Sequence, residues 1–142
     1  MNGTENKGTC LYRIYEQRQK PLVKKIALPF RGKKTRMTET RIYIGLNDAQ
    51  TKEQIFETER YMSVLKHVCC SYHVAFSVSI ENGGYFHDDG EFTEETSFVL
   101  LLINVDRKVV GEIAKDLCSF FNQESVLVTE NRISGYFTGG VF

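Results

Sequence analysis

Apolar and polar positions change their period along the chain, and each period predicts an element of secondary structure. Residues 41–45 alternate between apolar and polar side chains, which predicts a first strand. Thr51 and Gln54 have the spacing of a capping box, which indicates that a helix follows over residues 51–70. The apolar stripe expected on this helix consists of Ile55, Met62, Leu65, Cys69 and Tyr72.

The next part of the chain predicts two further strands. Residues 74–80 alternate, and residues 97–103 form a more continuous apolar run that suits the centre of a sheet. Between them, Asp88-Asp89-Gly90 is a turn signal. Asn82-Gly-Gly84 permits a bulge or a bend, because glycine tolerates positive φ angles.

A second helix and a last strand complete the pattern. Asp106 is the expected N-cap, residues 125–129 form the last full strand, and residues 136–137 add a short edge piece. The inner face of the helix is expected to carry Val109, Val110, Ile113, Leu117, Phe120 and Phe121. The order βαββαβ predicts an α+β, ferredoxin-like fold with a four-stranded antiparallel sheet and two helices on one face. The other face of such a sheet is solvated, binds a ligand or forms a subunit contact, and we expect a homo-oligomer.

Length and composition fit one soluble globular domain with an extension. The 142 residues are 42% hydrophobic and 25% charged. The net charge of zero conceals an uneven distribution, since residues 1–36 carry +8 and residues 37–142 carry −8. We therefore divide the chain into a basic N-terminal arm, residues 1–36, and a ferredoxin-like domain, residues 37–142. No apolar run reaches the roughly 18 residues that a membrane span requires.

The basic arm allows two interpretations. It tethers the chain to an acidic protein, an anionic ligand or nucleic acid, or it is a solvated extension beside the acidic body of its own or a neighbouring subunit. We favour the second. Nucleic acid fits less well, because the basic residues lack interleaved aromatics and the body is acidic. The arm residues assigned to electrostatic contact are Lys24, Lys25, Arg31, Lys33, Lys34 and Arg36.

Motifs for metal, cofactor or nucleophilic chemistry are not found. His87 beside Asp88 and Asp89 fits a solvated acidic turn better than a cation site. His67 and Cys70 have a helical spacing that allows contact, but no paired carboxylate supports a catalytic role. We therefore expect no catalytic residues, metal or cofactor. The four cysteines form no CxxC pair, and the N-terminus has no apolar signal stretch, which favours a cytoplasmic setting.

Three segments resemble a bacterial family of ferredoxin-like domains of unknown function, many of whose members are secreted or lipoprotein-like. They are Ile42-Tyr-Ile-Gly-Leu46, Gly84-Tyr85 to Asp89-Gly90 followed by Glu94-Glu95, and Phe121-Asn-Gln-Glu-Ser-Val-Leu127. The last segment, of the form F-x-Q-E-S-V-L, is the most specific. The resemblance spans roughly residues 41–137 and implies the fold without supplying an activity. The chain departs from the family in its basic arm and in lacking an export signal.

The polar cluster Gln123-Glu124-Ser125 marks the junction between the second helix and the last strand. It orients a ligand at the edge of the sheet, or it satisfies backbone groups at a tight turn, which is the interpretation we favour.

Two classes of function fit these observations. The first is a non-enzymatic binding or interaction protein that sequesters a small ligand or docks on a host protein, in the manner of accessory proteins of phages and mobile elements. The second is a small oligomeric enzyme with an apolar cleft, in which His73, Tyr43 or Glu124 would have to converge. The residues proposed for ligand or partner binding are Tyr43, Asn47, Tyr85, His87, Gln123, Glu124 and Arg132.

Overall fold

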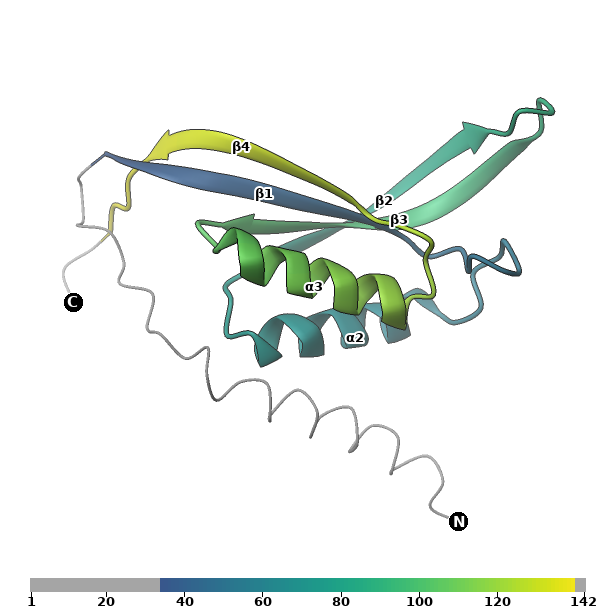
Figure 1. Ribbon diagram of the computed structural model, residues 1–142, viewed down its shortest axis with the longest axis horizontal. Coiled ribbons are helices and arrows are strands. Elements are labelled where there is room, and N and C mark those ends of the chain that lie inside the picture. The colour runs from purple at the N-terminus through teal and green to yellow at the C-terminus, as the bar shows by residue number, and fades with distance from the viewer. Residues whose placement is uncertain (1–33, 140–142) are drawn as a thin grey trace, which may run out of the picture.

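The computed structural model describes residues 34–139 and contains six elements in the predicted order. They are β1 (Thr35–Gly45), α2 (Thr58–Ser71), β2 (Ser77–Phe86), β3 (Phe92–Ile103), α3 (Arg107–Phe120) and β4 (Leu127–Gly135). The strands form one antiparallel sheet in the order β2-β3-β1-β4, and both helices lie on the same face of it (Figure 1). The ferredoxin-like prediction is therefore confirmed.

The alternation of side chains along β1 divides the sheet into a covered and an open face. Ile42 and Ile44 are fully buried towards the helices, whereas Tyr43 lies on the open face. Ile42 pairs with the fully buried Leu100 of β3 and with Val128 of β4, which is 41% exposed, so the helices cover the centre of the sheet more completely than β4. The core between sheet and helices includes Leu65, Val68, Cys69, Phe98, Leu102, Ile113, Leu117 and Phe121.

The start of the first helix differs from the prediction by seven residues. α2 begins at Thr58, and the capping-box residues Thr51 and Gln54 lie in the preceding loop. The Asp48 carboxylate accepts hydrogen bonds from the backbone amides of residues 50 and 51, which closes a turn where the helix was expected to begin. Ile55, expected in the apolar stripe, is consequently 50% exposed.

The strands are longer than the apolar patterns indicated. β1 begins at Thr35, two residues before the expected domain boundary, and pairs with β4 from its first residue. β2 starts at Ser77 and runs through residues 82–84 in continuous register with β3, without a bulge. β4 extends to Gly135, and the expected edge piece at 136–137 lies outside any strand.

The second helix follows the prediction closely. The Asp106 side chain accepts a hydrogen bond from the Lys108 amide at 2.8 Å, which confirms it as the N-cap of α3. Phe121 is buried as expected, but Phe120 is 37% exposed and lies outside the core. No helix within residues 34–139 is long and apolar enough to span a membrane.

Candidate functional site

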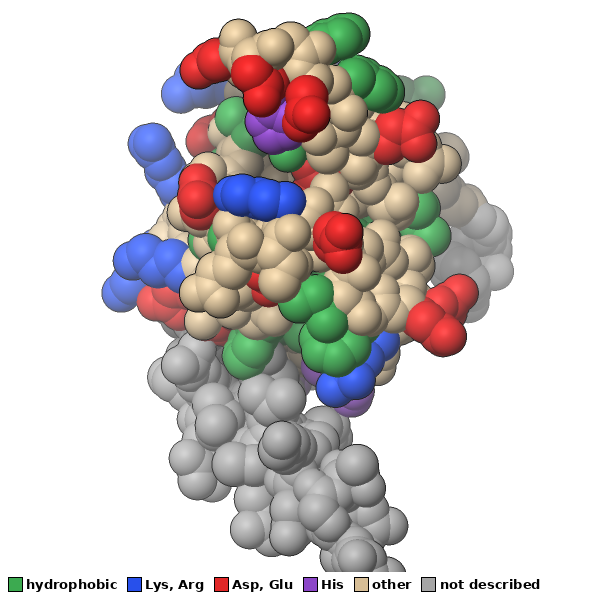
Figure 2. All heavy atoms as spheres, turned by 90° about the vertical axis from the view of Figure 1, so that its right-hand side faces the viewer, with side chains coloured by type: hydrophobic (Ala, Val, Ile, Leu, Met, Phe, Trp, Pro, Cys, Tyr) green, Lys and Arg blue, Asp and Glu red, His purple; other side chains and the backbone are tan. Residues whose placement is uncertain are grey.

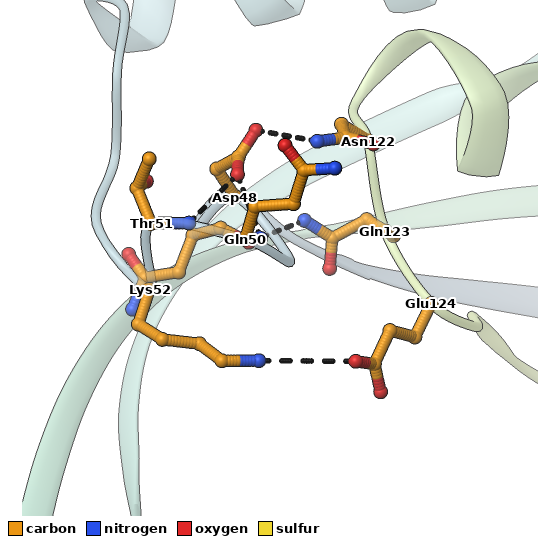
Figure 3. A network of polar contacts seen from close by, with 8 residues as sticks. Asp48, Gln50, Thr51, Lys52, Asn122, Gln123 and Glu124 are labelled. Atoms are coloured by element: carbon orange, nitrogen blue, oxygen red, sulfur yellow. Dashed lines mark hydrogen bonds and ion pairs between the residues drawn. The ribbon is translucent and has the colours of Figure 1, made fainter.

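The loop after β1 is tied to the junction between α3 and β4. The Asn122 side chain donates a hydrogen bond to Asp48 Oδ2 at 2.7 Å (Figure 3). The Asn122 carbonyl accepts a hydrogen bond from the Ala49 amide at 2.9 Å. Asn122 has a φ of 48°, a left-handed conformation that asparagine tolerates better than most residues. Two segments 74 residues apart in sequence are thereby held together.

Asp48 is the centre of this contact. Its carboxylate accepts from Asn122 and from the amides of Gln50 and Thr51, and its residue exposure is only 8%. The hydrogen bond from Asn122, followed by those from the two backbone amides, lowers the pKa of Asp48 below its usual 3.8. The carboxylate is therefore ionised at neutral pH and acts as a structural acceptor.

Gln123 and Glu124 have different roles within the same junction. The Gln123 side chain donates to the carbonyl of Asn47 at 2.6 Å, as the backbone-satisfying interpretation predicts. The Glu124 carboxylate instead lies 3.8 Å from Lys52 Nζ, and the side chain of Glu124 is 80% exposed. The structural interpretation therefore holds for Gln123, but it does not describe Glu124.

This difference gives a prediction for the two single alanine variants. Gln123→Ala should lower the free energy of unfolding by about 1 kcal/mol, because the partly buried carbonyl of Asn47 loses a donor. Glu124→Ala should change it by less than about 0.5 kcal/mol, because an exposed ion pair contributes little. Urea unfolding of both variants tests this, and an equal loss in the two would contradict the assignment.

A hollow of about 780 Å³ opens between the β2–β3 hairpin and the loop after β1. It is lined by Asn47, Gln54, Asn82, Gly83, Gly84, Phe92, Glu94, Glu95 and Thr96. The antiparallel register places Gly83 opposite Glu95 and Gly84 opposite Glu94. Gly83 borders open space opposite Glu95, whereas the Phe92 ring lies over Gly84, where a Cβ would overlap it.

Asn47 fixes the loop to the hairpin at the edge of this hollow. Its backbone amide donates to Glu95 Oε1 at 3.2 Å, and its side-chain amide donates to the Glu94 carbonyl at 3.3 Å. Gly45 permits this approach, because a Cβ at that position would overlap the Glu95 carboxylate. The Glu95 side chain is therefore held by the end of β1.

The hollow is acidic and has an aromatic wall. Among its lining residues, all within the described part of the chain, two are Glu and none is Lys or Arg. The Phe92 ring is 55% exposed, and its centroid lies 5.1 Å from that of Phe86. Carboxylates and an exposed ring together favour a ligand with a positive charge and an organic skeleton.

The structure distributes the proposed site residues over several regions. Asn47 lines the hollow, and Gln123 supports it from behind through the Asn47 carbonyl. Tyr85 and His87 lie near the hairpin tip, with ring centroids 4.9 Å apart, and His87 Nε2 lies 2.8 Å from Thr93 Oγ1. These two groups are outside the lining of the hollow.

The remaining proposed residues are dispersed. Tyr43 lies on the open face of β1, and Arg132 is exposed on β4. Of the arm residues, Lys34 and Arg36 are exposed at the beginning of β1. Lys24, Lys25, Arg31 and Lys33 lie outside the described residues.

The hollow contains residues that the sequence interpretation did not select. Gln54, Asn82 and Phe92 were not proposed as site residues, and Glu94-Glu95 entered only as part of a family resemblance. The sequence of the hairpin does contain a pattern from which the position of Glu94 and Glu95 could have been predicted. When residues are paired across the hairpin, outward from the Asp88-Asp89-Gly90 turn, Gly84 falls opposite Glu94 and Gly83 opposite Glu95.

The residues required by the enzyme interpretation do not meet. His73 follows α2, whereas Glu124 follows α3 at the opposite end of the helical layer (Figure 1). Burial raises the pKa of the Cys69 thiol to about 12, so it stays protonated at neutral pH. No three His, Cys, Asp or Glu side chains within residues 34–139 are grouped so that they could hold a metal ion.

Comparison with solved structures shows that the fold recurs elsewhere. A phage SAM lyase in complex with S-methyl-5'-thioadenosine is 19% identical, with a TM-score of 0.50 over 70% of this chain and 89% of that one. The apo state of a phage SAM lyase is 20% identical, with a TM-score of 0.52 over 70% and 88%. The PII-like protein CPII from Thiomonas intermedia K12, bound to ADP, AMP and bicarbonate, is 13% identical, with a TM-score of 0.40 over 72% and 96%.

The sequence itself matches a family model. No curated protein matches the chain significantly. Residues 39–137, which contain both helices and nearly all of the sheet, match the model described as Protein of unknown function (DUF3574). The match confirms the resemblance to an uncharacterised domain family. Because the match covers most of the chain, including the hollow and the β2–β3 hairpin, the chain belongs to the DUF3574 family.

Proposed function

We propose that the protein is a non-enzymatic binding protein that sequesters a small organic cation in the hollow between the β2–β3 hairpin and the loop after β1. The observation that carries this proposal is the composition of the lining: Glu94 shares a face of β3 with the exposed Phe92 ring, Glu95 lies on the other face beside the loop, and no lining side chain is basic. This lining favours a cation, in place of the anionic ligand considered from the sequence. Asn47 Nδ2, Gln54 Nε2 and Asn82 Oδ1 make hydrogen bonds within the protein, so the other amide atom of each side chain is the one that would contact a polar ligand.

A nucleoside with a sulfonium group is the ligand class that we propose. An aromatic ring binds the face of a nucleobase, side-chain amides bind its edge, and carboxylates bind ribose hydroxyls or a sulfonium charge. A phage SAM lyase with the same fold binds S-methyl-5'-thioadenosine, which supports the choice of this class as the probe.

The test is titration calorimetry of the full chain with three nucleosides: S-adenosylmethionine, a sulfonium; S-adenosylhomocysteine, its matched thioether; and S-methyl-5'-thioadenosine, a neutral thioether without the amino acid chain. We expect the sulfonium to bind more tightly than either thioether. The double variant Glu94→Gln/Glu95→Gln should weaken sulfonium binding by about tenfold or more, because charge-assisted contacts are lost. Phe92→Ala should weaken all three ligands, because all three use the same ring.

A matched control lies on the same hairpin. Glu81 is an exposed carboxylate of β2 that does not line the hollow, so Glu81→Gln should leave binding unchanged. Equal losses in Glu81→Gln and in the double variant would contradict the site. Recovery of a chemically altered probe after incubation would contradict sequestration and support the enzyme alternative.

A further inference from the structure

The two ends of the sheet carry opposite charge. Residues 77–97 contain six carboxylates and no Lys or Arg: Glu81, Asp88, Asp89, Glu91, Glu94 and Glu95. At the other end, residues 34–38 and 131–139 contain Lys34, Arg36 and Arg132 and no carboxylate. The hairpin and the β1–β4 end project in opposite directions from the helical layer (Figure 1). Acidic side chains gather over the hairpin at the top of Figure 2.

Exposed aromatic side chains accompany both charged ends. Phe86 at the end of β2 is 74% exposed and packs against the half-exposed Phe92. After β4, Tyr136 and Phe137 are 63% and 43% exposed. Aromatic side chains surrounded by charged groups are typical of protein contact surfaces.

The basic side chains of the β1–β4 end form a compact group. Arg36 pairs with Ser134 and Thr38 pairs with Arg132, so the two arginines are diagonal neighbours on adjacent strands. Side chains alternate between the two faces along β1, and Arg36 is six residues before the buried Ile42. Arg36 therefore lies on the face that carries the helices, as does Arg132, which is opposite Thr38. Phe86 and Phe92, which pair directly, lie on this same face by their alternation with Leu100.

We propose that the hairpin of one copy of the chain binds the β1–β4 end of a second copy, head to tail. Asp88 and Glu91 of the hairpin tip would contact Arg36 and Arg132, with the side chains of Phe86, Tyr136 and Phe137 packed between them. The contact joins two different surfaces, so it is heterologous and repeats from copy to copy into a ring or an open chain. It identifies the surfaces of an oligomer and does not depend on a ligand in the hollow.

The charge pattern favours a head-to-tail contact between two copies over a contact between their two hairpins. A symmetric contact between two hairpins would bring six carboxylates against six others, and like charges at an interface are unfavourable. The head-to-tail contact instead pairs opposite charges, so it should weaken as salt screens them.

Complementary charge reversals in the full chain test this arrangement. The hairpin variant is Asp88→Lys/Glu91→Lys, and the end variant is Arg36→Glu/Arg132→Glu. By sedimentation velocity at micromolar concentration, the wild type should form oligomers that dissociate at high salt. Each variant alone should self-associate about tenfold or more weakly. An equimolar mixture of the two should recover assembly, because each reversed surface then meets a complementary one.

Two control variants separate the contact from general charge effects. Glu53→Lys/Glu59→Lys changes exposed carboxylates outside both surfaces and should assemble like the wild type. Lys24→Gln/Lys25→Gln/Arg31→Gln changes the arm and should also assemble. Thermal unfolding checks that each variant is folded. If Arg36→Glu/Arg132→Glu does not fold, the neutral variant Arg36→Gln/Arg132→Gln takes its place.

Four results would overturn the proposal. They are a wild type that stays monomeric, reversal variants that assemble alone as well as the wild type, a mixture that stays dissociated, and loss of assembly in the arm variant alone. The last result would identify the arm as the occupant of the acidic hairpin. A restored mixture, with both controls intact, supports the head-to-tail contact.

Discussion

Replacing Phe121 with alanine is expected to lower the free energy of unfolding by about 3–5 kcal/mol. Phe121 is 3% exposed, and its ring meets those of Tyr61 and Phe98 edge to face at 5.1 and 6.1 Å. It connects the end of α3 with α2 and with the centre of the sheet. Truncation removes buried apolar surface and leaves a cavity that three separate elements would have to close.

The neighbouring phenylalanine is a matched control for this prediction. Phe120 is 37% exposed, so Phe120→Ala should cost about 1 kcal/mol or less. Chemical denaturation of both variants at neutral pH measures the difference. Similar losses at the two positions would show that the side chain of residue 121 does not anchor α3.

Replacing Asn122 with alanine is expected to cost about 2 kcal/mol, because two contributions add. The Asp48 carboxylate loses the donor at 2.7 Å, and alanine must adopt a φ of 48°. Asn122→Gly separates the two contributions, because glycine adopts this conformation without strain and loses only the hydrogen bond. The glycine variant should therefore be the more stable of the two.

The effect of Asn122 should also depend on pH. The hydrogen bond from Asn122 is the largest cause of the lowered pKa of Asp48, so it stabilises the folded chain only while Asp48 is ionised. This stabilisation is fully present above the unfolded pKa, near 3.8, and is lost as pH falls through the lower folded value. Melting temperatures of wild type and Asn122→Gly should differ at pH 7 and converge in acid. A constant difference would contradict the assignment to the ionised carboxylate.

The sequence predicted best the features that depend on side-chain period and local capping. The alternation around Ile42 and the cap at Asp106 are confirmed, because burial on one face and a side chain bonding a nearby amide are local properties. The predicted start of α2 was wrong, and the cause is again a local hydrogen bond between a side chain and nearby backbone amides. Thr51 and Gln54 match a capping box, but Asp48 binds the neighbouring amides first and turns the chain before a helix begins.

The candidate site was less predictable, because it depends on contacts between distant segments. Asn47 was selected from the sequence, whereas its partners Glu94 and Glu95 were not, since 47 and 48 residues separate them from it. The register of the hairpin could have been predicted from the sequence. The approach of the loop to the hairpin was not, because it requires the position of β1 beside β3 in the folded sheet.

The backbone amide, the side-chain amide and the backbone carbonyl of Asn47 make hydrogen bonds to three different residues. Its amide binds Glu95, its side chain binds the Glu94 carbonyl, and its carbonyl accepts from Gln123. A shift of the loop would therefore break hydrogen bonds to both the hairpin and the α3–β4 junction. These bonds hold the loop side of the hollow against the hairpin before any molecule binds. Binding there should be governed by the fit and charge of the ligand, with association little slowed by rearrangement of the protein.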